Sequence, residues 1–398
     1  NGEDSTTMLG GFTITNGSGT LVGSYYKGGG IYSIAGAAPS FIDLRITNNS
    51  VNGEGGGVFC NGSNPIINNV TINGNYAEDG GGGFVSAGGS VPSLYNVIIN
   101  DNSSSGAGGG AVFSGSTVSP VLMNVIISNN STDSYGGGLY CAGSSSNPSL
   151  VNVTITGNSA DNGGGGIYCA DDANPSLINT VLWNDSPQEI YFRTDNSPNS
   201  ITIYYSDIQG GQDSIVTNDN GTVTWGDGNI DVDPLFVDAG NNDFNLTADS
   251  RCIDTGHPDS TNGDGTIADM GAYYYDQAGQ PLRVSNLITT PSADNVSVKW
   301  NANSDGASYN VYRSTDGGAD FYSLSPYATA SDTSYVDETA ADNTTYHYRV
   351  SAVDSESDEG VLAFADHGRT GADSTALYMP DVYLSRTTPP DLDAGTNF

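Results

Sequence analysis

The chain has 398 residues, room for two or three domains, and carries 45 Asp and Glu against 10 Lys and Arg, which gives a net charge of −35. This charge excludes nucleic acid as a natural partner and argues against an anionic membrane surface, because both are themselves negatively charged. No run of about 18 apolar residues occurs, so the sequence predicts no membrane span. The acidity favours a protein that binds divalent cations or stays soluble outside a cell.

The first stretch, Thr7 to Gly19, matches only the last strand of the repeat unit that follows it, for example Leu44 to Asn49. The first coil is therefore predicted to be partial. An open coil end exposes unpaired backbone groups and apolar side chains, and no amphipathic capping helix precedes it here. This end of the repeat is a candidate docking surface.

Residues 28–186 repeat one block six times. Each copy opens on a glycine triplet, and the triplets begin at Gly28, Gly55, Gly81, Gly108, Gly136 and Gly164. A proline follows each triplet, and apolar residues stand two and seven positions after it: Phe41, Ile67, Leu94, Leu122, Leu150 and Leu177, then Ile46, Ile72, Ile99, Ile127, Ile155 and Leu182. Such a period predicts a solenoid of strands with one turn per copy, in which each apolar set forms one interior column.

Two more columns consist of Asn, with Asp in one copy of each. Four residues after the proline stand Asp43, Asn69, Asn96, Asn124, Asn152 and Asn179, and ten after it stand Asn49, Asn75, Asn102, Asn130, Asn158 and Asp185. An Asn at a bend can adopt a left-handed backbone, and identical residues stacked about 4.8 Å apart can pass hydrogen bonds along the column. We expect a structural role for both columns.

At these residues the chain resembles a known family. Units such as GGGIY (Gly28–Tyr32), GGGLYC (Gly136–Cys141) and NPSLVNVTITGNSA (Asn147–Ala160) are similar to the repeats of right-handed parallel β-helix proteins, of the kind found in polymorphic outer-membrane proteins and choice-of-anchor proteins. The resemblance covers roughly residues 1–275. It implies an all-β solenoid and leaves the activity open, because this fold carries lyases, hydrolases, adhesins and stalks.

The middle positions of the strands that follow the triplets form one set, which we call the aromatic column. Its members are Tyr32, Phe59, Val85, Val112, Tyr140 and Tyr168. If the first and third positions point inward, this column faces outward. An outward aromatic stripe can stack on sugar rings or on another protein, so Tyr32, Phe59, Tyr140 and Tyr168 are candidate ligand- or partner-binding residues. Alternatively, the column is covered by flanking loops or by the C-terminal domain.

Residues 1–187 are thus predicted as regular coils and residues 188–280 as irregular terminal coils with a cap, which ends in DMGAY (Asp269–Tyr273), similar to the end signature of choice-of-anchor proteins. Five oxygen-bearing residues fall within sixteen positions of the cap: Asp254, Asp259, Asn262, Asp264 and Asp269. They are candidate calcium ligands. The alternative is a solvated turn whose side chains bond their own backbone.

Residues 281–365 have a different pattern. Val296–Trp300, Tyr309–Ser314 and Thr345–Asp354 alternate apolar and polar residues and are spaced like the strands of a β-sandwich. They resemble a fibronectin type III domain, with Trp300 as its core tryptophan and Tyr346 as its tyrosine corner.

Residues 366–398 are predicted as a docking tail. Two strand-like stretches in this tail contain Leu377, Tyr378, Val382 and Tyr383, which are candidate partner-binding residues. Such a tail can add a strand to its own domain or to a neighbouring copy.

The sequence contains no catalytic constellation. A β-helix lyase needs basic residues at its site, and the first 280 residues hold only Lys27, Arg45, Arg193 and Arg251, with a single histidine, His257. Carboxylates that could act in pairs on a glycoside stand before the triplets, at Glu54, Glu78, Asp79, Asp133 and Asp161, although a solvated edge explains them as well. We therefore expect no enzymatic activity.

The sequence favours a secreted, non-enzymatic structural or adhesive protein of the cell surface that joins copies of itself head to tail into filaments. Two alternatives remain: a monomeric adhesin or glycan-binding surface protein, and a polysaccharide lyase or glycoside hydrolase on a β-helix. The expected partners are copies of the chain or cell-surface and glycan partners. No signal peptide is visible, so the extracellular assignment rests on composition and resemblance.

Overall fold

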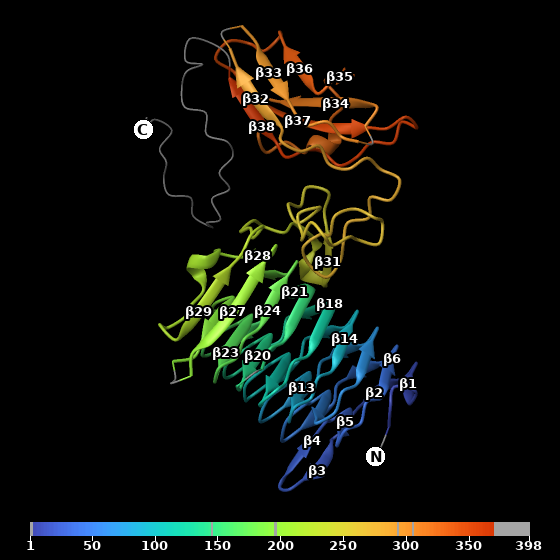
Figure 1. Ribbon diagram of the computed structural model, residues 1–398, viewed down its shortest axis with the longest axis vertical. Helices are drawn as coiled ribbons and strands as arrows, with labels where there is room; N and C mark the ends of the chain where they lie inside the picture. The colour runs from blue at the N-terminus through green and yellow to red at the C-terminus, as the bar shows by residue number, and fades with distance from the viewer. Residues whose placement is uncertain (1–2, 145, 195–196, 293, 305, 370–398) are drawn as a thin grey trace. The chain divides into compact units, whose positions relative to one another are not determined.

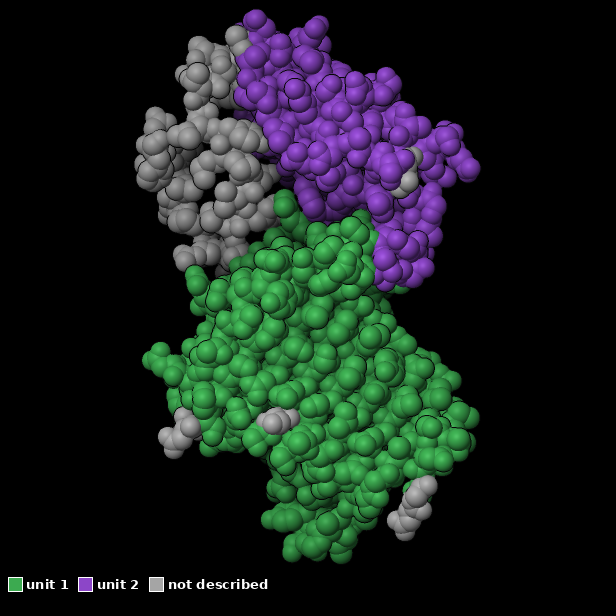
Figure 2. Space-filling model, viewed as in Figure 1, with its two compact units in different colours: residues 1–246, 251–260, 267–274 green, residues 247–250, 261–266, 275–398 purple. Residues whose placement is uncertain are grey.

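The computed structural model describes residues 3–144, 146–194, 197–292, 294–304 and 306–369. Apart from three short 3-10 helices, the regular elements in these ranges are strands, which confirms the predicted all-β class. The chain forms two compact units, coloured separately in Figure 2: unit 1 (residues 1–246, 251–260 and 267–274) and unit 2 (residues 247–250, 261–266 and 275–398). None of the helices in the described ranges has the length and apolar character needed to cross a membrane.

Unit 1 is a solenoid in which the strands of successive coils lie side by side and pair in parallel (Figure 1). Its largest sheet has fifteen strands: β1 (Met8–Gly10), β2 (Thr13–Thr15), β6 (Ser40–Ile42), β7 (Arg45–Thr47), β10 (Ile66–Asn68), β11 (Thr71–Asn73), β14 (Ser93–Tyr95), β15 (Ile98–Asn100), β18 (Val121–Ser128), β21 (Ser149–Thr156), β24 (Ser176–Ile178), β25 (Val181–Trp183), β27 (Asn199–Tyr204), β28 (Asp207–Ile208) and β29 (Gly221–Trp225).

Two further parallel sheets complete each coil. The seven-stranded sheet follows the glycine triplets and contains β5 (Ile31–Ile34), β9 (Val58–Asn61), β13 (Phe84–Ala87), β17 (Ala111–Ser114), β20 (Leu139–Ala142), β23 (Ile167–Ala170) and β26 (Ile190–Phe192). The five-stranded sheet contains β8 (Ser50–Val51), β12 (Tyr76–Ala77), β16 (Ser103–Ser104), β19 (Ser131–Thr132) and β22 (Ser159–Ala160). Between β2 and β5 the chain forms the hairpin β3 (Thr20–Val22) and β4 (Tyr25–Lys27).

The interior of unit 1 contains the two apolar columns that the repeat predicts. All twelve residues are buried in one continuous cluster, because the strand register superimposes equivalent residues: Ile72 pairs with Ile46 on one side and with Ile99 on the other. The first and third positions of the strand after each triplet are also buried, as in the pair Val58 and Cys60 of β9. The predicted inward orientation of these positions is therefore confirmed.

The two Asn columns have different roles. The residues four positions after the proline, here the outer column, all have φ between 51° and 56°, as a left-handed bend requires. The residues ten positions after the proline, here the inner ladder, are buried. At each step the Oδ1 atom of one ladder residue accepts hydrogen bonds from both the backbone N–H and the Nδ2 of the preceding one, for example Asn102 from Asn75 at 3.0 and 2.9 Å.

Beyond the regular coils, unit 1 continues through η1 (Gln212–Ser214) to the antiparallel hairpin β30 (Phe236–Asp238) and β31 (Asp243–Leu246), with η2 (Ala239–Asn241) between its strands. Phe244 of this hairpin packs on Ile126 and Ala272, outside the solenoid interior. The backbone N–H of Ala272 donates to Thr154 Oγ1 at 2.9 Å. These contacts cover part of the outer face of the fifteen-stranded sheet.

Unit 2 is a β-sandwich. One sheet contains β32 (Ile288–Pro291), β33 (Val296–Lys299) and β36 (Ser334–Asp337), and the other contains β35 (Ala328–Ala330), β34 (Ser308–Ser314), β37 (Thr345–Val353) and β38 (Asp366–Arg369), with η3 (Phe321–Ser323) after β34. This three-plus-four arrangement agrees with the predicted fibronectin type III fold. Trp300 is buried edge-on to Tyr309, and the Tyr346 hydroxyl lies 3.5 Å from the Ala341 backbone nitrogen, where a tyrosine corner places it.

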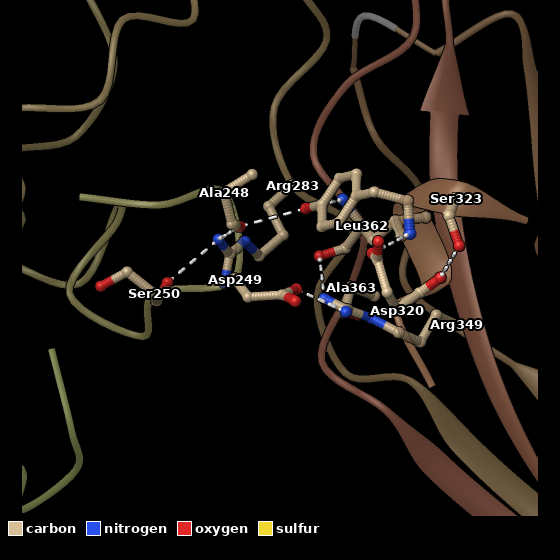
Figure 3. Close-up of polar contacts among 10 residues, drawn as sticks. Ala248, Asp249, Ser250, Arg283, Asp320, Ser323, Arg349, Leu362 and Ala363 are labelled. Atoms are coloured by element: carbon tan, nitrogen blue, oxygen red, sulfur yellow. Dashed lines mark hydrogen bonds and ion pairs between the residues drawn. The ribbon is translucent and has the colours of Figure 1, made fainter. Parts of the chain in front are cut away.

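The sandwich unit also includes residues 247–250, which the sequence assigns to the cap. Figure 3 shows Arg349 directed at Asp249, with Nη1 and Oδ1 2.5 Å apart. Arg283 Nη2 donates to the carbonyls of Ala248 and Ser250, both at 3.2 Å. Because Arg349 is buried, its charge depends on Asp249 and on carbonyls of the sandwich for compensation.

We expect the Asp249→Ala variant to destabilise unit 2 by about 1–2 kcal/mol, less than the loss of a fully buried partner, since the Asp249 side chain is itself partly solvated. Hydrogen exchange of the β37 amides should then speed up. The matched control, Glu356→Ala, removes an exposed carboxylate of the same unit and should leave β37 unchanged. Equal exchange in the two variants would contradict a stabilising role for Asp249.

Candidate functional site

The first coil of unit 1 has an open end, formed by β1, β2 and β5. Among the described residues, β1 pairs only with β6, β2 only with β7 and β5 only with β9. The N–H groups of Ile31 and Ala35 donate toward β9, to Gly57 and Asn61. Since alternate residues of a parallel strand bond to opposite sides, the N–H groups of Tyr32 and Ile34 point to the edge without a neighbouring strand.

Apolar side chains gather at the same open end. A cavity of about 340 Å³ lies there, lined among others by Leu9, Ile31 and Phe41, which belong to β1, β5 and β6. Met8 is 66% exposed and Phe12 is 60% exposed. An unpaired edge beside exposed apolar surface is suited to accept an added strand. The partial first coil that the sequence predicts is therefore found in unit 1.

The aromatic column faces outward as predicted, but its members cover one another. Tyr32 stacks on Phe59, with ring centroids 5.6 Å apart, and Tyr168 stacks on Tyr140 and Tyr191 at 5.3 and 5.6 Å. Phe59 and Tyr168 are each only 2% exposed, so neither offers a ring face to a ligand. Tyr32 and Tyr140 are half-buried and remain candidates.

The glycine triplets explain this burial. The first glycine of each triplet has a positive φ and packs closely against the aromatic column. At Gly55, for example, an added Cβ would lie 2.8 Å from the Cβ of Phe59. Lys27 also lies over the Phe59 ring, 4.9 Å from its centroid, and pairs with Glu54 at 2.6 Å. The column is thus a second packed layer outside the solenoid, in line with the covered alternative. Sequence periodicity could not reveal how closely the turns approach it.

The five predicted calcium ligands are held mainly by hydrogen bonds with the local chain. Asp269 Oδ1 accepts from the Asp254 backbone N–H at 2.8 Å in unit 1. Asp264 lies in unit 2, where Oδ1 accepts from the N–H of Thr266 and Oδ2 from the N–H of Gln277, which lowers the pKa of this carboxyl against the effect of its partial burial.

Asn262 bonds to Thr266 in the same turn, and the Asp259 N–H bonds to His257. In the described ranges, no three His, Cys, Asp or Glu side chains converge as a metal site would require. Calcium binding stays a prediction, and the geometry resembles the alternative of self-bonded turns.

Leu377, Tyr378, Val382 and Tyr383, the predicted contact residues of the tail, lie outside the described residues. Their proposed role in strand addition is therefore a prediction of the sequence alone.

Of the carboxylates in front of the triplets, one forms an ion pair and the others are exposed. Glu54 is bound to Lys27, while Glu78, Asp79, Asp133 and Asp161 are exposed to solvent.

The carboxyls of unit 1 with raised pKa values are instead buried. Burial raises the pKa of Asp207 to about 7, and its Oδ2 atom accepts from the Cys252 thiol at 3.3 Å. Asp185 and Glu189 form a second buried set, at the end of the inner ladder. No sequence pattern marks these three as titrating groups, although Asp185 differs from the Asn residues at the other positions of its column.

The four cysteines, all within the described ranges, are buried and form no disulfide. Cys141 and Cys169 are paired in register on β20 and β23. Burial raises the pKa of both thiols and raises that of Cys60 to about 12. Their thiols stay protonated at neutral pH and act as small apolar side chains.

Unit 2 has a cavity of about 260 Å³, lined among others by Tyr312, Tyr322 and Glu359. The Glu359 carboxylate accepts from the hydroxyls of Tyr312, at 2.6 Å, and Ser351. Tyr322 is 43% exposed. An exposed ring beside a fixed carboxylate can hold a sugar ring or a cation.

A family model described as "Right handed beta helix region" matches residues 4–181. Among solved structures, a Fn3-like protein from Clostridium thermocellum is 29% identical, with 22% of this chain and 92% of that chain covered and a TM-score of 0.20. The sixth fibronectin type III domain of human fibronectin type III domain containing protein 3 is 18% identical, with 24% and 91% covered and a TM-score of 0.21.

A β-1,2-glucanase from Parabacteroides distasonis is 23% identical, and the match covers 27% of this chain and only 15% of the glucanase, with a TM-score of 0.19. No curated protein matches the chain. These partial likenesses carry no argument about activity. The parallel coils and the matching family model together identify residues 4–181 as a right-handed β-helix region.

Proposed function

We propose that the chain is a non-enzymatic structural or adhesive protein of the cell exterior, and that the open end of unit 1 binds a strand from a second copy. The observation that carries the proposal is that β1, β2 and β5 each have an edge that no strand of the described ranges pairs with, beside exposed Met8 and Phe12. An added strand would satisfy the free backbone groups and cover the apolar side chains in one step.

The occupant is the tail of the neighbouring copy, whose strand-like stretches contain Leu377, Tyr378, Val382 and Tyr383. When two different surfaces of identical chains meet, each added copy leaves one surface of each kind exposed. Repeated contacts of this kind give filaments, unless the rotation between successive copies closes them into a ring. Two observations support a non-enzymatic role. The carboxylates before the triplets are solvent-exposed or paired. The carboxyls of unit 1 with raised pKa values lie in its interior.

The test compares the full chain with a chain that ends at Arg369 and with a Phe12→Lys variant. Electron microscopy and light scattering should show filaments for the full chain and single particles for both altered chains, since a lysine at the open end opposes strand addition. Ile66→Lys is the matched control, because it places the same charge on an exposed apolar position of β10. Single particles for the full chain in every condition would refute self-assembly.

The cavity of unit 2 favours the second candidate function, binding of a glycan by a monomer. If it is correct, a glycan that binds the full chain should lose affinity at least about tenfold in the Tyr322→Leu variant, which removes the exposed ring and its stacking energy. Titration calorimetry measures this affinity. Unchanged binding would exclude the cavity as the glycan site.

A further inference from the structure

The inner ladder follows one hydrogen-bonding rule in all of its Asn positions. Each Asn uses Nδ2 as a donor to a backbone carbonyl of the preceding coil, and these carbonyls are those of Ile14, Ile46, Ile72, Ile99 and Ile127. The same Nδ2 also donates to the Oδ1 of the next ladder residue, as Asn130 does to Asn158 at 2.9 Å. Every position of the ladder thus needs one acceptor atom and one donor atom.

Asp185 keeps the acceptor half of this rule. Its Oδ1 atom accepts from the backbone N–H of Asn158 at 2.7 Å and from Asn158 Nδ2 at 2.8 Å. The carbonyl that corresponds to the others is that of Ile155, because Leu182 pairs with Ile155 as Ile155 pairs with Ile127. The donor position is occupied by Oδ2, a buried oxygen without a hydrogen-bond partner.

Glu189 takes the place of the next ladder residue. Its Oε1 atom accepts from the Asp185 backbone N–H at 3.1 Å, as an Asn Oδ1 does elsewhere in the ladder. Asp185 and Glu189 are only 8% and 5% exposed, and Glu189 Oε2 is also buried and unpartnered. Two ionised carboxylates in this position would leave two buried oxygens without donors and would repel each other.

We infer that Asp185 and Glu189 share one proton at neutral pH, so that a protonated carboxyl supplies the donor that the two buried oxygens, Asp185 Oδ2 and Glu189 Oε2, otherwise lack. The proton lets one carboxyl of the pair donate to the other, in place of the amide donor that Nδ2 supplies in the Asn residues. Loss of this proton weakens the end of the ladder. The stability of unit 1 therefore depends on pH through this pair.

The electrostatics of the pair favour Glu189 as the carboxyl that holds the shared proton, because its pKa is the higher of the two. Burial is the main cause that raises both pKa values, to about 6 for Asp185 and to about 11 for Glu189, whose pKa is also raised by the Asp185 charge and by a hydrogen bond to Asp185. The other groups that act on the two carboxyls are Asn158 and the backbone N–H groups of Asn158, Asn184 and Asp185, all neutral.

The flanking ionisable side chains do not supply a cation to the pair. Asp161 follows β22, Asp207 belongs to β28, and Arg193, beyond β26, pairs with Asp171. Because both pKa values lie higher in the folded chain than their ordinary values of 3.8 and 4.5, the stabilisation is complete below those values and is lost as the pH rises through about 6 toward about 11.

The test measures denaturant unfolding of the full chain and of D185N/E189Q, which restores an all-amide ladder. Between about pH 6 and 9 the unfolding constant of the wild type should rise about tenfold per pH unit relative to the double variant, the slope for one proton released on unfolding. The control D161N removes an exposed carboxyl near the same coils and should keep the wild-type slope. Equal slopes for the wild type and the double variant would overturn the inference.

Infrared spectroscopy of the wild type tests the proton directly and does not depend on the folding of a variant. At about pH 9, well above the pKa of Asp207, the pair should still give the C=O stretch of a protonated carboxyl. As acid is added, this band should stay constant until carboxyls outside the pair, such as Asp207, begin to protonate. A spectrum at this pH with carboxylate bands alone would show that both groups are ionised and would overturn the inference.

Discussion

The Asn102→Ala variant is expected to lose about 3–6 kcal/mol of unfolding free energy, a large share of the about 5–15 kcal/mol that stabilises a typical domain. The change removes the acceptor of the Asn75 backbone N–H and of Asn75 Nδ2, and it removes the donor to the Ile72 carbonyl. Asn75 Nδ2 keeps its bond to the Ile46 carbonyl, but one of its hydrogens loses its acceptor, as does the Asn75 backbone N–H, and the Ile72 carbonyl loses a donor. Each partner that a buried polar group loses costs about 1–3 kcal/mol.

Denaturant unfolding followed by circular dichroism measures this loss. The matched control is Asn68→Ala in β10, because Asn68 is half-buried and its side chain accepts one hydrogen bond near the surface, from Asn96 at 3.2 Å. The control should change the stability by less than about 1 kcal/mol. Equal losses in both variants would mean that the inner ladder contributes no more than a surface amide.

The Gly109→Ala variant is expected to destabilise unit 1 by about 3 kcal/mol or more. Gly109 is the middle glycine of its triplet, and an added Cβ would stand 2.5 Å from the Ser131 carbonyl oxygen and 2.6 Å from that of Gly137. Both atoms are backbone oxygens, of the strand β19 and of the next glycine triplet, so no side chain can turn aside. The coils would have to separate to accept one methyl group.

The control for this variant is Gly240→Ala in η2, where the added Cβ would meet only the Asp238 side chain, at 3.6 Å. This control should stay within about 1 kcal/mol of the wild type. The measurement is again denaturant unfolding, joined by hydrogen exchange of β17 and β20, which should be the strands most affected. If Gly109→Ala unfolds like the control, close contact between coils is not the reason for the triplets.

The solenoid could be predicted because its determinants repeat. A single Ile or Asn does not predict a fold. Ile46, Ile72 and Ile99 recur at a nearly constant spacing, which predicts that they lie on the same face of successive strands in one register, and the parallel pairs have that register. The left-handed bends at the outer column follow from Asn in the same way. Pattern could not tell which of the two Asn columns is buried, because both are equally polar.

Features that depend on single contacts were out of reach of the sequence. The burial of Phe59 and Tyr168 depends on how closely the triplet turns approach, which periodicity does not encode. The inclusion of residues 247–250 in the sandwich depends on Arg349, 100 positions after Asp249, and on Arg283, 35 positions after Ala248. Asp185 was visible as an exception to the ladder, but only its buried neighbour Glu189 gives that exception a chemical meaning.

The nearly constant register of the coils also has a consequence for how such a protein changes its size. Each coil meets its neighbours through the same interior residues and the same ladder bonds, so duplication or deletion of one whole block leaves every remaining interface intact. The length of the rod would then change in increments of about 4.8 Å, the spacing between neighbouring strands. Gene-level recombination between whole blocks would therefore change the length of the solenoid in equal steps.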